Sequence, residues 1–70
     1  MNVLVFKTNI NSMEQVRKIA PHIRKAEGVV KHNFDLNDCD NILRIEAEGI
    51  SSNTIIELVQ HHGYYCEELS

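Results

Sequence analysis

The apolar residues of this 70-residue chain change their spacing along the sequence, and this change of period is the strongest constraint on the fold. Apolar side chains first alternate from Leu4 to Ile10, which is typical of a strand with one buried face. From Ser12 the spacing becomes helical, with Val16 and Ile19 on one side of the helical wheel. The sequence therefore predicts a strand that is followed at once by an amphipathic helix.

The same change of period occurs again in the second half of the chain. The expected elements are a strand over 30–36, a hairpin tip at 37–41, a strand over 43–47, a helix over 53–62 and a short strand over 64–69. Gly49 separates the third strand from the second helix, and Ser51 or Ser52 can cap that helix. The predicted order is strand, helix, strand, strand, helix, strand.

This order predicts an α+β ferredoxin-like sandwich. Each strand–helix–strand unit crosses over right-handed, and two such units interleave as a four-stranded antiparallel sheet in the order 4-1-3-2. Both helices then cover one face of the sheet. The end of the first strand, the hairpin tip and the end of the second helix should share one end of the sheet. We expect residues 1–70 to form a single domain.

Composition excludes several function classes. The net charge of −3 argues against bulk affinity for nucleic acids, and the longest apolar run, "VLVF", is too short for the ~20 residues that span a bilayer. Two cysteines without a framework spacing and no secretory signal fit a reducing cytoplasm. We find no catalytic triad, phosphate loop or paired-carboxylate pocket, and we expect no enzyme.

The stretch "TNINSMEQVRKIAPHI" resembles the start of a heavy-metal-associated domain, the module of copper chaperones and metal-pumping ATPases. That family has a Met-x-Cys-x-x-Cys loop between its first strand and first helix. Here Ile10 takes the methionine position, and Ser12 and Gln15 stand where the two thiolate ligands would be. The segments "EGVVKHNFDLND" and "HHGYYCEE" are similar to the Gly-Val plus second strand and to the Gly-Tyr-x-Ala-Glu ending of the family.

The replaced cysteines change what the resemblance implies. Thiolates select soft Cu(I), whereas a hydroxyl and an amide are poor soft ligands, so we expect no metal at Ser12 and Gln15 and no cofactor. Ser-x-x-Gln is instead a capping box, in which Gln15 should reach back to the N–H of Ser12. The resemblance then implies a non-catalytic domain with a degenerate metal site, acting as a protein-binding or regulatory module in metal homeostasis.

An alternative metal site remains open at the shared end of the sheet. Cys39, His61 and His62 could bind copper or zinc there, which would make the chain a metal-binding or transport protein with a relocated site. The same residues also fit a solvated loop cysteine and two histidines at the negative end of a helix dipole. Adjacent helical residues point about 100° apart, so His61 and His62 cannot easily chelate one ion together.

The outer face of the first helix is basic. Arg17, Lys18, Arg24 and Lys25 cluster opposite its apolar stripe. This is either an ordinary solvated face or, as the family implies, a docking face for an acidic protein partner such as a metal transporter domain. A homo-oligomeric structural domain is a third alternative. It would use the apolar residues expected on the helix-free face of the sheet, which are Val3, Val5, Ile42 and Tyr65.

Strand parity also predicts the environment of two reactive side chains. Cys66 should face inward with Tyr64 as a small buried hydrophobe. Val30, His32 and Phe34 share the inward parity of the second strand, and His32 is expected to be a half-buried packing residue.

Overall fold

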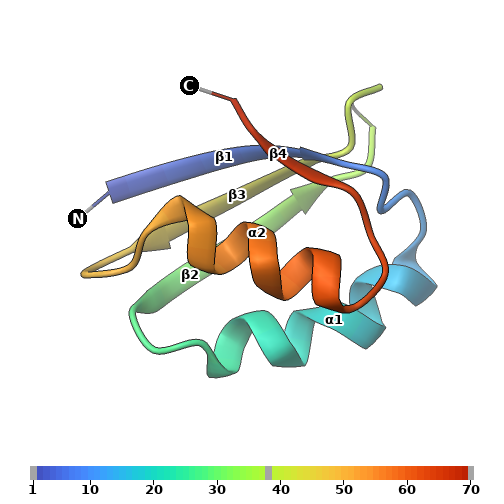
Figure 1. Cartoon of the computed structure of the whole chain (residues 1–70). Helices are drawn as coiled ribbons and strands as arrows, with labels where there is room; N and C mark the ends of the chain where they lie inside the picture. The colour runs from blue at the N-terminus through green and yellow to red at the C-terminus, as the bar shows by residue number, and fades with distance from the viewer. Residues whose placement is uncertain (1, 38, 70) are drawn as a thin grey trace.

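The computed structural model describes residues 2–37 and 39–69, and these residues contain the predicted order βαββαβ. The elements are β1 Asn2–Thr8, α1 Met13–Lys25, β2 Val29–Asp35, β3 Ile42–Ala47, α2 Ser52–His61 and β4 Cys66–Glu68. The strands form one antiparallel sheet in the order β2-β3-β1-β4, which confirms the predicted neighbours. Both helices lie side by side on one face of this sheet (Figure 1). No helix in the described ranges is long and apolar enough to cross a membrane.

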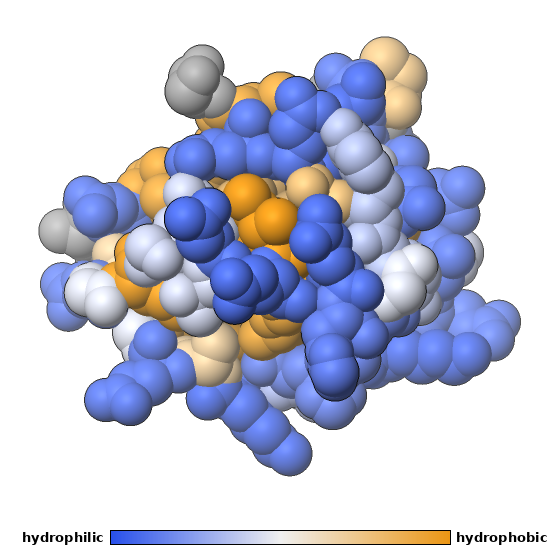
Figure 2. Space-filling view, viewed as in Figure 1, coloured by the Kyte–Doolittle hydropathy of each residue, from blue (hydrophilic) through white to orange (hydrophobic). Residues whose placement is uncertain are grey.

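The core lies between the sheet and the two helices. The cross-strand pairs Leu4–Ile45 and Phe6–Leu43 point toward the helices from β1 and β3. The hydrophobic side chains that are fully buried are Phe6, Ile10, Ile19, Ile23, Leu43, Ile45, Ala47, Ile55 and Val59. Hydrophilic side chains cover most of the surface seen from the helix side, with a small hydrophobic area near its centre (Figure 2). The strand and helix periods therefore located the buried faces of β1, β3 and the two helices correctly.

One part of β2 departs from the predicted alternation. Val29 and Lys31 pair with the consecutive residues Ala47 and Glu46 of β3, so a β-bulge leaves Val30 as the extra residue. Val30 is 57% exposed, and the prediction that it faces inward is wrong. His32 and Phe34, which follow the bulge, are half-buried as predicted.

The helix-free face of the sheet carries apolar and charged residues in alternation. In the β1–β3 ladder the residue pairs on this face are Val3–Glu46, Val5–Arg44 and Lys7–Ile42. Each apolar side chain is thus directly opposite a charged one. The hydroxyl of Tyr65 donates a hydrogen bond to the carboxylate of Glu67. The apolar residues lie on this face as expected, but charged neighbours separate them.

Candidate functional site

The turn between β1 and α1 is closed by a helix cap. Ser12 is extended (φ −138°, ψ 155°), and its Oγ accepts a hydrogen bond from the backbone N–H of Gln15 at 3.2 Å. The side-chain Oε1 of Gln15 accepts from the backbone N–H of Asn11 at 2.8 Å. The capping serine is confirmed, whereas the expected bond from Gln15 to the N–H of Ser12 is replaced by one to the preceding residue. Both polar side chains are therefore engaged in starting the helix.

The same turn is fastened to three other parts of the molecule. The Thr8 hydroxyl donates to the carbonyl oxygen of Asn41 at 2.7 Å and accepts from the N–H of Ile10 at 3.1 Å. The side chain of Ile10 is fully buried in the core. Asn9 accepts through Oδ1 from the N–H of Tyr65 at 2.8 Å, which ties the turn to the entrance of β4. The hairpin, the core and β4 thus fix the backbone of this turn.

The donor atoms at this turn do not suit a soft metal ion. Ser12 offers a hydroxyl and Gln15 an amide oxygen, and Cu(I) prefers sulfur ligands. Within residues 2–37 and 39–69, no group of three or more His, Cys, Asp or Glu side chains is placed to hold a metal ion.

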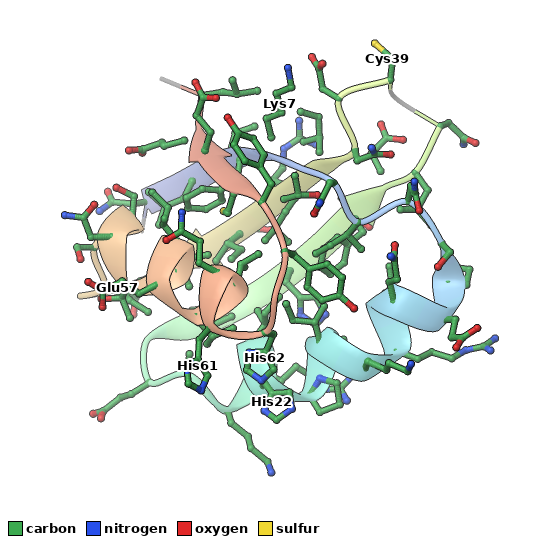
Figure 3. The ribbon with its side chains drawn as sticks, turned by 45° about the vertical axis from the view of Figure 1, so that its right-hand side comes forward. Lys7, His22, Cys39, Glu57, His61 and His62 are labelled. Carbon is green, nitrogen blue, oxygen red and sulfur yellow. The ribbon has the colours of Figure 1, made fainter. Side chains whose placement is uncertain are left out.

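The structure separates Cys39 from the histidines that were expected beside it. Cys39 is exposed at the tip of the β2–β3 hairpin, at the upper end of the view in Figure 3, while His61 and His62 lie at the lower end. The sheet end is shared, as predicted, but the hairpin lies on the far side of β1 from β4, into which α2 leads. The prediction that these three residues form one neighbourhood is therefore wrong.

His62 instead lies next to His22 of α1. Their ring centroids are 4.2 Å apart with the planes tilted by 40°, and the two side chains point toward each other (Figure 3). The ring of His61 lies farther from that of His62 than the ring of His22 does, with a centroid distance of 5.6 Å. Sequence reasoning missed His22 because it lies on the exposed flank of α1, and only the side-by-side packing of the helices brings α2 to it.

The basic face of α1 is formed as predicted. Arg17, Lys18, Arg24 and Lys25 are all exposed. Lys18 Nζ lies 3.4 Å from Glu14 Oε1 one turn earlier, in a pair of which both members are highly exposed. The pKa of His32 on β2 is lowered, first by burial and second by the positive charge of the Arg24 guanidinium. The four basic side chains are therefore solvent-exposed along α1.

The two cysteines occupy opposite environments. Cys66 is only 4% exposed and packs in the core, as strand parity predicts. Burial raises the pKa of its thiol to about 11, so this thiol stays protonated near neutral pH. Both Cys39 and Cys66 are free thiols.

The sheet order and the two helices on one face define the ferredoxin-like fold that heavy-metal-associated domains adopt. One similar solved structure is described as concerning crosstalk between Cu(I) and Zn(II) homeostasis. It matches with a TM-score of 0.86 and 14% identity, over 99% of this chain and 100% of that chain. Another is the yeast copper transporter domain Ccc2A in its apo and Cu(I)-loaded states, with a TM-score of 0.87 and 18% identity, over 100% of this chain and 97% of that one. No protein-family model and no curated protein sequence matches the chain.

These comparisons correct the expectation that the chain has no metal cofactor. Both similar structures concern the handling of Cu(I), and one of them was solved in a Cu(I)-loaded state. The expectation rested on the missing thiolate pair at Ser12 and Gln15 alone. Loss of ligands at one position does not remove the other imidazole and thiol groups of the chain, which are also metal ligands.

Proposed function

We propose that this chain is a non-catalytic cytoplasmic domain of copper or zinc homeostasis that docks on an acidic surface of a protein partner, such as a metal transporter domain. The observation that carries the proposal is the likeness to two domains of copper and zinc handling over almost the whole length of all three chains. At 14% and 18% identity this likeness concerns the fold, so the docking step is argued from the surface of this chain.

The docking surface of the proposal is the outer face of α1. Four of the seven basic residues of the chain lie on this helix, although the net charge of the chain is −3. All four are exposed, and only Glu14 within the helix opposes them. A concentrated positive face on an acidic domain orients it toward a negative partner and increases the rate of encounter.

The test combines a phenotype with a charge-reversed allele. Deletion of the gene in its native organism should change copper or zinc tolerance, together with the cellular content of that metal measured by mass spectrometry. The wild-type gene should restore both. An allele with Arg17→Glu and Arg24→Glu should fail to restore them at equal protein level, because the two side chains lie on one stripe of α1.

The matched control carries the same change of charge elsewhere. Lys31 and Arg44 are exposed residues of β2 and β3, away from α1, and an allele with Lys31→Glu and Arg44→Glu should restore the phenotype. Purified variants should keep a cooperative thermal transition. Unchanged metal content and tolerance in the deletion strain would refute the role in metal homeostasis. Restoration by the α1 allele would refute docking through this face.

A further inference from the structure

We propose that His22 and His62 form a two-imidazole site for a divalent transition-metal ion, Zn(II), Ni(II) or Cu(II), that joins α1 to the end of α2. The ring centroids of these residues are 4.2 Å apart, although the two histidines are 40 positions apart in the sequence. This site goes beyond the docking proposal, which uses the basic residues of α1. It is also distinct from the Ser12 and Gln15 position of the β1–α1 turn.

The hydrogen bond of His62 prepares its ring for a metal. Nδ1 of His62 lies 2.9 Å from the carbonyl oxygen of Leu58. A carbonyl oxygen only accepts, so Nδ1 carries the proton in this contact and Nε2 of the neutral ring holds a free lone pair. Histidines that bind metals commonly donate their other ring N–H to a backbone carbonyl in this way, which fixes the tautomer and the orientation of the ring. The backbone of α2 thus presents Nε2 as a ligand.

His22 is placed to supply the second ligand. It is exposed on α1 and borders a surface hollow of ≈ 260 Å³ whose other lining residues are Lys18, Ile19, His62 and Tyr64. Metal–nitrogen bonds of about 2.0–2.1 Å put two imidazole nitrogens about 3.3 Å apart on a tetrahedral ion. The two ring centroids are already 4.2 Å apart. Rotation of the exposed His22 side chain is therefore enough to bring one of its ring nitrogens to this distance from Nε2 of His62. Water molecules entering from the open hollow complete the coordination shell.

The remaining groups around the hollow are compatible with a cation. Lys18 brings a positive charge to its rim, but its Nζ lies 3.4 Å from the Glu14 carboxylate, which draws the ammonium along the helix. Two neutral imidazoles select zinc, nickel or copper over magnesium or calcium, since the latter prefer oxygen ligands. Because one ligand lies on α1 and the other at the C-cap of α2, only the folded chain presents them together. The bound ion therefore stabilises the native state.

The experiment uses the untagged, reduced chain and titrates it with Ni(II) and with Zn(II) in a calorimeter. We expect one equivalent of ion per chain. His22→Gln and His62→Gln should each weaken binding by about tenfold or more, because each leaves a single imidazole. The controls are the other two histidines and the exposed thiol. His32→Gln, His61→Gln and Cys39→Ser should keep the affinity of the wild type, since these side chains lie outside the pair.

A second measurement separates lost ligation from lost folding. The ion should raise the melting temperature of the wild type and of the three controls, and should leave those of the His22→Gln and His62→Gln variants unchanged. His22 is exposed, so His22→Gln is expected to melt near the wild type when no ion is added. Absence of binding heat in the wild type would overturn the site. So would binding that survives in both variants, or that is lost in His61→Gln or Cys39→Ser. The purified chain suffices, so the result is independent of the metal-homeostasis phenotype.

Discussion

Gln15 donates its backbone N–H to the hydroxyl of Ser12 at 3.2 Å. This bond caps the N-terminus of α1 at the position where heavy-metal-associated domains have a pair of thiolates. The side chain of Gln15 turns back to the N–H of Asn11. The turn is thus complete as a helix start without any bound ion. Ser12 and Gln15 can therefore be tested as structural residues first.

Removal of the cap should destabilise the fold. Ser12→Ala leaves the N–H of Gln15 without its acceptor, and we expect a loss of about 1 kcal/mol in the free energy of unfolding, measured by urea denaturation. The matched control is Ser51→Ala at the start of α2, where the serine makes no side-chain cap hydrogen bond. Equal losses in the two variants would show that the Ser12 hydroxyl does not act as the cap.

Two cysteines at the cap should create a Cu(I) site. In Ser12→Cys with Gln15→Cys, thiols stand three residues apart across the first turn of α1, on a turn that the core and β4 already hold in place. The double variant should bind one more equivalent of Cu(I) than the wild type, because thiolates suit this ion. Its metal-free form should lose about 1 kcal/mol with the cap, and copper should raise its melting temperature above that of the metal-free form.

The single variant Ser12→Cys is the control for this gain, because one thiol cannot supply the pair. Competition against a Cu(I)-specific chelator measures the extra equivalent. A double variant that competes no better than Ser12→Cys would mean that the backbone of the turn does not bring the two sulfur atoms to one ion.

Gly28 should tolerate alanine less well than Gly63. Both have positive φ, +100° and +89°, but a Cβ on Gly28 would lie 2.5 Å from the carbonyl oxygen of Glu48, whereas nothing lies within 4 Å of one on Gly63. Gly63→Ala should cost about 1 kcal/mol through backbone conformation alone. Gly28→Ala should cost about 2 kcal/mol or more, because the backbone of Glu48 must move as well. Denaturant unfolding of both variants ranks them, and the reverse order would contradict the close approach of Gly28 to the backbone of Glu48.

The thiols should differ strongly in reactivity. Cys39 is exposed, whereas Cys66 is buried and its pKa is raised to about 11, so it offers little thiolate near neutral pH. Iodoacetamide should label Cys39 rapidly and Cys66 only after unfolding, as peptide mass spectrometry can follow. We also expect no intramolecular disulfide, since β1 lies between the β4 strand of Cys66 and the β2–β3 hairpin that carries Cys39. A bridged monomer after mild oxidation would contradict this strand order.

The free energy of unfolding should decrease as the pH is lowered, and part of this decrease should come from His32. Burial, and then the charge of Arg24, lower the pKa of His32 below its ordinary value of 6.5. As pH falls through 6.5 the unfolded chain takes up the proton before the folded chain does, so the free energy of unfolding declines until the lowered folded pKa is passed. His32→Gln should show a shallower decline between about pH 7.5 and 5 in urea titrations, because its side chain does not titrate. The exposed His61→Gln is the control, and a wild-type slope in His32→Gln would rule out this contribution.

The sequence by itself determined the elements and their buried faces. The period-two runs around Phe6 and Leu43 and the helical run around Ile19 place apolar side chains on one side of each element, so they predict both the order βαββαβ and the core. With the right-handed crossover rule, the simplest sheet order is 4-1-3-2, which the structure confirms. Ser12 was recognisable as the cap because a capping box spans only four consecutive residues.

Only the tertiary structure decided which distant residues meet. The bulge that exposes Val30 arises from the pairing of β2 with β3. The alternation of apolar and polar residues along β2 does not predict it. The contact of His22 with His62, and the separation of His62 from Cys39, depend on how two packed helices lie across a sheet several strands wide. Hydrophobic periodicity fixes the face that an element buries. It does not fix which exposed flanks come together, because those positions follow from the mutual packing of elements far apart in the chain.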